Sequence, residues 1–332
     1  MPYSVAVIRI GHNLFDGFEK MTRFGYACIN LSLAAIHGKS APTTNRSMIK
    51  KTFEQKGISY ASKLSLENSK DLFTILKWNV ENEIFFFRLT SNLFPWASEY
   101  QISSMPDYEE IRSVLSECGN YARENGIRIT SHPGPFNKLC SPNESVVLNT
   151  IKDLEMHGEI FDMIGLPQNH WSKINIHVGA AYDSKVDAAA TFRRNFARLS
   201  PSVSGRLTLE NDDKGSLFST KDLYEMIYSE VGIPIVHDQH HHGFCDGGLT
   251  QYEAMKLAFS TWPKGITPVM HYSESKSDEA KDNKIKPQAH SDYVVNKIET
   301  HEFDVDVMIE AKAKDLALLN YLSIYKLPST NL

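Results

Sequence analysis

Short runs of hydrophobic and β-branched residues recur along the chain, and most of them pass into a polar or charged residue at their end. Such runs predict buried β-strands. The longer stretches between them place apolar residues at the 3.6-residue spacing of amphipathic helices. In two stretches, Asp107 with Glu110 and Thr250 with Glu253 predict capping boxes at the start of a helix. The predicted strands cover residues 23–30, 84–91, 128–134, 174–179, 206–211, 234–238, 268–273 and 304–310.

Eight strands that alternate with helices predict a single-domain α/β protein with the TIM, or (β/α)8, barrel fold. The chain has 332 residues, and such a barrel usually takes about 250. We expect the barrel domain to span residues 23–326, with two or more helices in a long insertion at 31–82. Residues 1–22 are expected to form an N-terminal extension with an extra strand in residues 1–20. The polar loop 273–287 is expected to be mobile.

The composition is that of an ordinary globular protein, with 42% hydrophobic and 23% charged residues. Its four cysteines stand far apart without a CxxC pair, so neither a disulfide framework nor a zinc finger is indicated. We recognise no signal peptide and no apolar run near the ~18 residues of a membrane span, and therefore expect a cytoplasmic protein, or a nuclear one in a eukaryote. The net charge of −5 weighs against a nucleic-acid partner unless divalent cations reverse the sign of an acidic site.

The stretch from Pro234 to Phe244 holds the densest group of metal-binding side chains in the chain. Its apolar run passes without a turn into one Asp and four His residues, so a buried strand is expected to end in a carboxylate and imidazoles. These groups suit Zn, Mn or Fe. A (β/α)8 barrel gathers its chemistry at this end of its strands. A surface histidine cluster is the alternative interpretation of the stretch.

Other predicted strands also end in residues that can bind metal. Taken alone, a His at a strand end is more often a hydrogen-bonding loop residue than a ligand, and a lone Glu is more often a solvated charge. In a barrel, however, their side chains converge on one axis, and unpartnered buried carboxylates and imidazoles would cost several kcal/mol each. The strand-end residues are Asn30, His132, His177, Glu210, Asp238 with His241, His271 and Glu310.

This set contains more ligands than one divalent ion needs. Sites with two or three ions use a carboxylate to bridge ions about 3.5–4 Å apart, and they stabilise the attacking and the leaving oxygen of a phosphoryl displacement. The residues therefore predict a multinuclear, metal-dependent hydrolase of phosphodiesters. A metal-dependent sugar isomerase or epimerase and a non-catalytic metal-storing or metal-sensing barrel are the alternatives, because a barrel fold does not determine its function.

Eight motifs carry a resemblance to a known family: RFGYACIN (23–30), SHPG (131–134), IHVG (176–179), LEND (209–212), HDQHHH (237–242), MHYSE (270–274), AHSD (289–292) and MIEAK (308–312). Together they resemble the UV damage endonucleases, relatives of the endonuclease IV type of abasic-site nuclease. The resemblance implies a monomeric TIM barrel with three divalent ions, Mn²⁺ before Zn²⁺ or Mg²⁺. It also implies that double-stranded DNA is nicked immediately 5′ to UV photoproducts, which leaves a 3′-hydroxyl.

The resemblance also implies roles for individual residues. Glu210 matches the carboxylate that bridges two ions, and Glu99 stands where family members carry a further His. The implied ligands are His132 and His177 with Glu210 in one site, Asp238, His271 and Glu310 in a second, and His241 and His290 around a third ion. The implied catalytic residues are Glu210, His241 and His290.

Four residues match positions that the resemblance places against DNA. Tyr26 and Asn30 match residues at the mouth of the site, where an aromatic ring stacks on an extruded base. Pro135 and Phe136 replace a Gln-Tyr pair that probes the strand opposite the lesion, so Phe136 keeps a stacking ring while the amide is lost. In a second departure, Val269 stands where the family often has a Lys, modified in some members.

Overall fold

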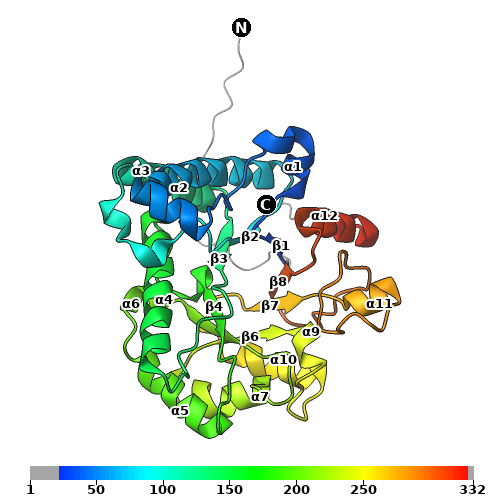
Figure 1. The fold of residues 1–332 in the computed structure, drawn as a ribbon. Coiled ribbons are helices and arrows are strands. Elements are labelled where there is room, and N and C mark those ends of the chain that lie inside the picture. The colour runs from blue at the N-terminus through cyan, green and yellow to red at the C-terminus, as the bar shows by residue number, and fades with distance from the viewer. Residues whose placement is uncertain (1–21, 328–332) are drawn as a thin grey trace, which may run out of the picture.

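The computed structural model describes residues 22–327, within which eight parallel strands form a closed barrel in chain order. The predicted TIM barrel is thereby confirmed, and Figure 1 shows the strands as an inner ring with the helices outside it. The predicted extension and its strand fall almost entirely outside the described residues. The strands are β1 (Phe24–Ala27), β2 (Phe86–Leu89), β3 (Arg128–Ser131), β4 (Ile174–His177), β5 (Leu207–Glu210), β6 (Ile235–Asp238), β7 (Val269–Tyr272) and β8 (Asp306–Ile309).

Helices follow the strands and cover the outside of the barrel (Figure 1). The predicted insertion after β1 holds the first two of them, and Gly57 interrupts the long second helix at φ 62°. No helix of the described part is both long and apolar enough to cross a membrane. The α-helices are α1 (Leu31–His37), α2 (Lys50–Glu81), α3 (Tyr108–Glu124), α4 (Glu144–Ile164), α5 (Lys185–Phe196), α6 (Pro201–Ser204), α7 (Thr220–Leu223), α8 (Ser229–Val231), α9 (Gln239–His242), α10 (Gln251–Ser260), α11 (Lys276–Ala280) and α12 (Lys314–Tyr325).

Short 3₁₀ and π segments complete the chain path: η1 (Gly38–Ser40), η2 (Ala97–Glu99), η3 (Ile102–Ser104), η4 (His170–Ser172) and the π-helical η5 (Tyr224–Tyr228). The predicted capping box of Thr250 and Glu253 is confirmed at the start of α10. The box predicted at Asp107 is wrong, because its side chain makes no capping bond to α3. The Asp107 carboxylate instead accepts a hydrogen bond of 2.8 Å from the Ser62 hydroxyl of α2. Asp107 thus pairs with a residue of another helix instead of with the backbone at the start of α3.

Alternate residues of each strand face the interior of the barrel, as the two-residue period of a strand requires. Below the mouth, the interior is filled by an apolar layer that includes Phe86, Val236 and Met308. Gly25 makes room for this layer, since a Cβ there would lie 2.5 Å from the carbonyl oxygen of Phe86 and 2.8 Å from its ring. The outward residues of the strands, such as Ile176, pack in the main core cluster beneath the helices.

Arg128 lies fully buried at the start of β3 and forms part of the barrel floor. Its guanidinium donates to Asp306 Oδ2 at 2.7 Å. It also donates to three carbonyl oxygens, those of Trp171 and Thr267 at 2.8 Å and of His170 at 3.0 Å. Asp306 begins β8, which does not neighbour β3 in the barrel. The ion pair therefore joins separate parts of the barrel through its interior.

Candidate metal centre

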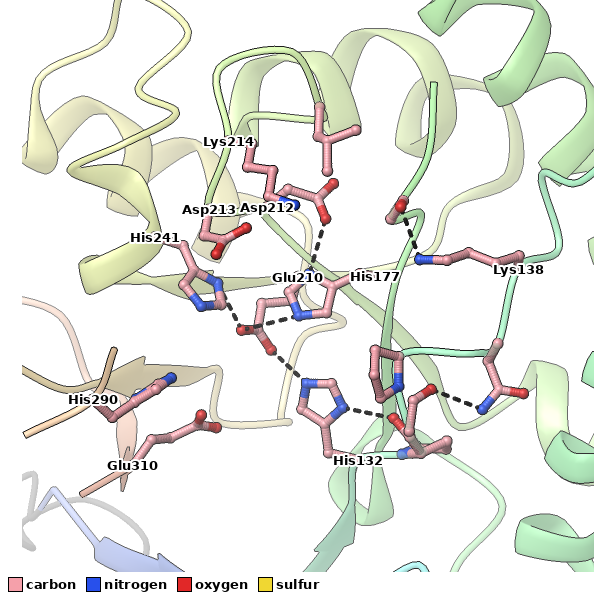
Figure 2. A pocket seen from close by; sticks show the side chains of 16 residues that line it. His132, Lys138, His177, Glu210, Asp212, Asp213, Lys214, His241, His290 and Glu310 are labelled. Atoms are coloured by element: carbon pink, nitrogen blue, oxygen red, sulfur yellow. Dashed lines mark hydrogen bonds and ion pairs between the residues drawn. The ribbon is translucent and has the colours of Figure 1, made fainter. Parts of the chain in front are cut away.

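A pocket of about 350 Å³ opens at the carboxyl-terminal end of the strands. Figure 2 shows side chains from several strand ends and loops pointing into it. The strand register explains why they meet, because His177 lies opposite Glu210 in the β4–β5 pair and Asp238 opposite His271 in the β6–β7 pair. The pocket is lined by His132, Pro133, Gly134, Pro135, Asn137, Lys138, His177, Gly179, Glu210, Asp212, Asp213, Lys214, Leu217, His241, His290 and Glu310.

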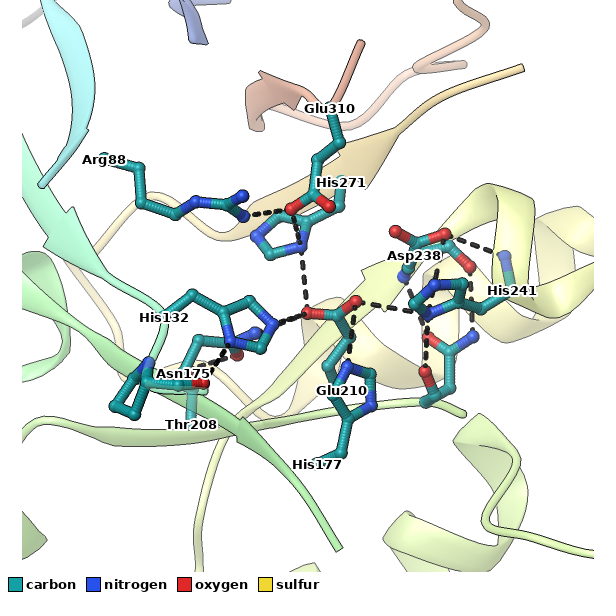
Figure 3. A network of polar contacts seen from close by, with 12 residues as sticks. Arg88, His132, Asn175, His177, Thr208, Glu210, Asp238, His241, His271 and Glu310 are labelled. Atoms are coloured by element: carbon teal, nitrogen blue, oxygen red, sulfur yellow. Dashed lines mark hydrogen bonds and ion pairs between the residues drawn. The ribbon is translucent and has the colours of Figure 1, made fainter. Parts of the chain in front are cut away.

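Glu210 stands at the centre of this arrangement, and each of its carboxylate oxygens faces two imidazoles (Figure 3). Its Oε2 lies 2.9 Å from His271 Nδ1 and 3.1 Å from His132 Nε2. Its Oε1 lies 3.2 Å from His241 Nδ1 and 3.6 Å from His177 Nε2. The two oxygens therefore belong to two neighbouring sets of ligands, which is the geometry that a bridging carboxylate requires.

Three groups of side chains could each hold one metal ion, with ligand atoms that all lie within 4.8 Å of one another. Two of these groups share Glu210, and two share His271. The expected second site, Asp238 with His271 and Glu310, is brought together as one group. His132 and His177 both contact Glu210 but fall into different groups. The groups are His132, Glu210 and His271; His177, Glu210 and His241; and Asp238, His271 and Glu310.

The donor atoms in these groups suit divalent cations. Glu210 Oε1, Asp238 Oδ2 and His271 Nδ1 are buried without a hydrogen-bond partner in the described chain. His271 Nδ1 lies 2.9 and 3.0 Å from oxygens of Glu210 and Glu310, yet the geometry is not that of a hydrogen bond. Buried polar atoms without partners are costly, and a shared cation would satisfy several of them at once. The residues thus fit a metal centre of mixed imidazole and carboxylate ligands.

The electrostatics of the site also favour cations. Burial alone would raise the pKa of the Glu210 carboxyl, but His271 and His177 hold it well below its usual range. Burial alone would lower the pKa of His241, but Asp238 and Glu210 raise it to about 11. By contrast, burial lowers the pKa of His132 to about 4, so its imidazole is neutral near pH 7, as a ligand must be. The carboxylates thus maintain a negative field that attracts positive charge.

Residues that the sequence did not single out hold these ligands in place. The Arg88 guanidinium of β2 forms an ion pair with Glu310 Oε1. The Asn175 amide donates to Glu210 Oε2, and its own oxygen accepts a 2.8 Å hydrogen bond from the Thr208 hydroxyl. Both Asn175 and Thr208 precede a strand-end ligand by two residues, so the strand period places them on the inward face. That spacing was the signal that could have found them.

Lys173 is a further buried neighbour of the site. Its Nζ lies 3.2 Å from His271 Nε2, on the opposite side of the ring from the carboxylates. Burial lowers the pKa of its ammonium to about 7. Val269, where the family often has a Lys, packs in the apolar layer of the barrel instead. A lysine therefore does approach His271 in this chain, but it comes from the residue just before β4.

Two of the expected DNA-contacting residues are buried, and the structure contradicts their assignment. Tyr26 is 0% exposed, because it faces outward from β1 and packs against Phe87 beneath α2. Its hydroxyl donates to Asn79 of α2 at 2.8 Å. Asn30 is 2% exposed and caps α1, with its oxygen accepting from Leu33 N and its amide donating to Tyr26. Neither side chain has a free surface for a nucleotide.

The loop after β3 carries the other two expected DNA-contacting residues, Pro135 and Phe136. Pro135 lines the metal pocket, and the Phe136 side chain is 88% exposed. Phe136 also borders a second pocket of about 820 Å³, which Glu99 lines as well. Glu99 is exposed and belongs to none of the ligand groups in the described chain, so its assignment as a metal ligand stays a prediction.

His290 lines the metal pocket but is not part of a three-ligand group within residues 22–327. The centroid of its ring lies 5.6 Å from that of His240 and 6.3 Å from that of His241. Within the described chain, His290 Nδ1 and His240 Nε2 are both buried without a hydrogen-bond partner. The assignment of His290 to a third ion with His241 stays a prediction.

A closed parallel barrel with carboxylates and imidazoles from six strands at its mouth defines a TIM-barrel protein with a candidate multinuclear metal centre. More particularly, the chain belongs to the UV-endonuclease UvdE family, whose model matches residues 22–331. The predicted family resemblance is thereby confirmed.

Similar proteins agree with this membership. A UV-damage endonuclease of Schizosaccharomyces pombe is 36% identical over 326 residues, which are 95% of this chain and 53% of that protein. The chain thus spans about half the length of this relative. A UV DNA damage endonuclease of Clostridium perfringens is 31% identical over 92% of this chain and 71% of its own length. The crystal structure of SacUVDE matches with a TM-score of 0.79 and 30% identity over 92% of this chain and 98% of that one.

A more distant solved structure, a D-tagatose 3-epimerase-like protein, is 14% identical with a TM-score of 0.50. The match covers 75% of this chain and 92% of that one. A likeness at this level of identity shows the barrel fold alone and does not favour the isomerase or epimerase alternative.

Proposed function

We propose that this protein is a metal-dependent DNA repair endonuclease that nicks duplex DNA immediately 5′ to UV photoproducts and leaves a 3′-hydroxyl. The expected lesions are cyclobutane dimers, 6-4 photoproducts and other distorting damage. The observation that carries the proposal is Glu210, each of whose oxygens faces two imidazoles in a chain that belongs to the UvdE family. We further infer that it acts as a monomer, in the cytoplasm or in a eukaryotic nucleus, as the family resemblance implies.

In this proposal the protein binds three divalent ions, with Mn²⁺ the first choice. Bound ions would stabilise the charge that develops on the phosphodiester and on its attacking and leaving oxygens. Glu210 orients two ligand sets by offering one oxygen to each. Arg88 fixes the Glu310 carboxylate, and Asn175 fixes that of Glu210. His241 and His290 are proposed to hold the third ion beside the scissile phosphate.

The direct test is nicking of UV-irradiated and untreated supercoiled plasmid in the presence of Mn²⁺. We expect the irradiated plasmid to be converted to the open circle while the untreated plasmid stays supercoiled. Sequencing-gel analysis of a duplex with one defined dimer should place the cut directly 5′ to it. Equal nicking of both plasmids would contradict recognition of damage, and turnover of a ketose by the same preparation would favour the epimerase alternative.

Phe136 is proposed to enter damaged duplex as a wedge. Its exposed ring lies between Pro135 and Asn137, which both line the metal pocket, and stacking on a base contributes about 1–3 kcal/mol whatever the base. Extrusion of a damaged base costs less than extrusion of a paired one. Phe136→Ala should therefore weaken binding to UV-damaged duplex by about 1–3 kcal/mol and hardly change binding to undamaged duplex, as measured by fluorescence anisotropy.

The Phe136→Tyr variant serves as the matched control because it keeps an aromatic face, and it should bind damaged duplex like the wild type. An equal loss on both DNAs after Phe136→Ala, or no loss on either, would place the ring outside the lesion.

A further inference from the structure

Lys138 lies on the wall of the metal pocket, two residues after Phe136 (Figure 2). Among the described residues that line this pocket, Lys138 and Lys214 carry the lysine ammonium groups, and the pocket contains no arginine. Lys214 is exposed, whereas Lys138 is half-buried. Lys138 therefore places a fixed positive charge within a pocket whose other charged side chains include several carboxylates.

The position of the Lys138 side chain is fixed by its contacts with Gly179. Its Nζ donates to the Gly179 carbonyl oxygen at 2.8 Å. Gly179 has a φ of +69°, and a Cβ at this position would lie 2.0 Å from the Lys138 Nζ. Only glycine thus leaves space for the ammonium there. The backbone is fixed as well, because Lys138 N donates to the Thr150 hydroxyl at 2.9 Å.

The Lys138 ammonium has N–H donors that the Gly179 carbonyl does not use. A lysine ammonium carries three N–H donors and no acceptor, and the Gly179 carbonyl uses one of them. Within residues 22–327, no Asp or Glu oxygen lies within the 4.0 Å of an ion pair with Lys138. Lys185 makes the contrast, since its Nζ is paired with Asp222 at 2.7 Å. The unpaired charge of Lys138 is thus available to an anion that enters the pocket.

We propose that Lys138 binds a phosphodiester oxygen of the DNA strand that enters the metal pocket. The proposal rests on the proposed function, and it assigns to the loop after β3 a phosphate contact in addition to the aromatic ring of Phe136. A phosphate contact adds affinity without reading the base, so it should act on damaged and undamaged DNA alike. It differs in this respect from the wedge proposed for Phe136.

The test compares binding of UV-irradiated and unirradiated duplex oligonucleotides over a range of salt concentrations for the wild type, Lys138→Met and Gly179→Ala. Lys138→Met should lower the association constant about 3- to 10-fold at low salt on both DNAs. It should also reduce the slope of log K against log salt concentration by about 0.9, the contribution of one phosphate contact. Gly179→Ala should weaken binding in the same way although the lysine is still present, because the new Cβ displaces the ammonium.

Lys63→Met is the matched control, since Lys63 is an exposed lysine of α2 that lies beside Glu67, and its salt slope should equal that of the wild type. Metal content and thermal melting are measured for every variant. An unchanged slope for Lys138→Met, whether affinity is kept or is lost together with bound metal, overturns the inference. If the wild type nicks irradiated DNA and only the Lys138 result fails, the proposed function stands; if the wild type neither binds nor nicks DNA, both fall.

Discussion

Glu210→Gln is expected to lower the rate of nicking of UV-irradiated DNA by more than about a hundredfold while the barrel stays folded. The Glu210 oxygens each face two imidazoles, so one neutral amide in its place weakens two ligand sets at once. The substitution keeps the size of the side chain, and a strand-end ligand contributes little to the core. On the same preparation, single-turnover nicking would measure the rate, metal analysis the amount of bound ion, and thermal melting the stability of the fold.

The control for this variant is Glu299→Gln, which changes a carboxylate that is 59% exposed. It should nick irradiated DNA at the wild-type rate. If Glu210→Gln nicks within about tenfold of the wild type and binds the same amount of metal, Glu210 has no bridging role.

Asp306→Ala is expected to lower the free energy of unfolding by about 3–5 kcal/mol. Asp306 is 1% exposed and accepts hydrogen bonds from Arg128 and Arg23, so its removal leaves the fully buried Arg128 guanidinium without a counter-charge. Equilibrium unfolding in urea measures the loss. Asp304→Ala, which removes an exposed carboxylate two residues earlier, should change the free energy of unfolding by less than about 0.5 kcal/mol.

A double variant separates the uncompensated charge from lost packing. Arg128→Met combined with Asp306→Leu removes both members of the pair, and apolar replacements of a buried pair are often neutral or stabilising. Much of the stability lost in Asp306→Ala should therefore return. If the double variant is as unstable as the single one, the cost lies in packing or in the carbonyl contacts of Arg128 and not in the unpaired charge.

The sequence predicted the barrel and the grouping of most candidate ligands for one physical reason. In parallel strands the carboxyl ends meet at one mouth, so polar residues at those ends, such as His177 and Glu210, can be grouped from their positions in the chain alone. The residues that support them lie deeper in the strands. Asn175 and Arg88 face the interior only because of the two-residue period, and which contacts they make depends on the register between strands.

The same period explains the main error in the predicted site. Tyr26 was assigned to the mouth by its match to the family, but Gly25 and Ala27 are the inward positions of β1. Tyr26 between them faces α2. The position of Glu99 could not be predicted for a different reason: it follows β2 by ten residues, and no local pattern predicts how a loop of that length returns to the mouth.

The filled interior of the barrel bears on how bound ions would enter and leave the protein. Below the candidate ligands, the apolar layer with Phe86, Val236 and Met308 and the buried Arg128 occupy the described barrel, so ions bound there would exchange with solvent through the mouth. A duplex bound across that mouth would act as a lid over the cations. The rate at which a chelator strips the enzyme would then be set by how long DNA stays bound, and free and DNA-loaded enzyme would lose their ions on different timescales.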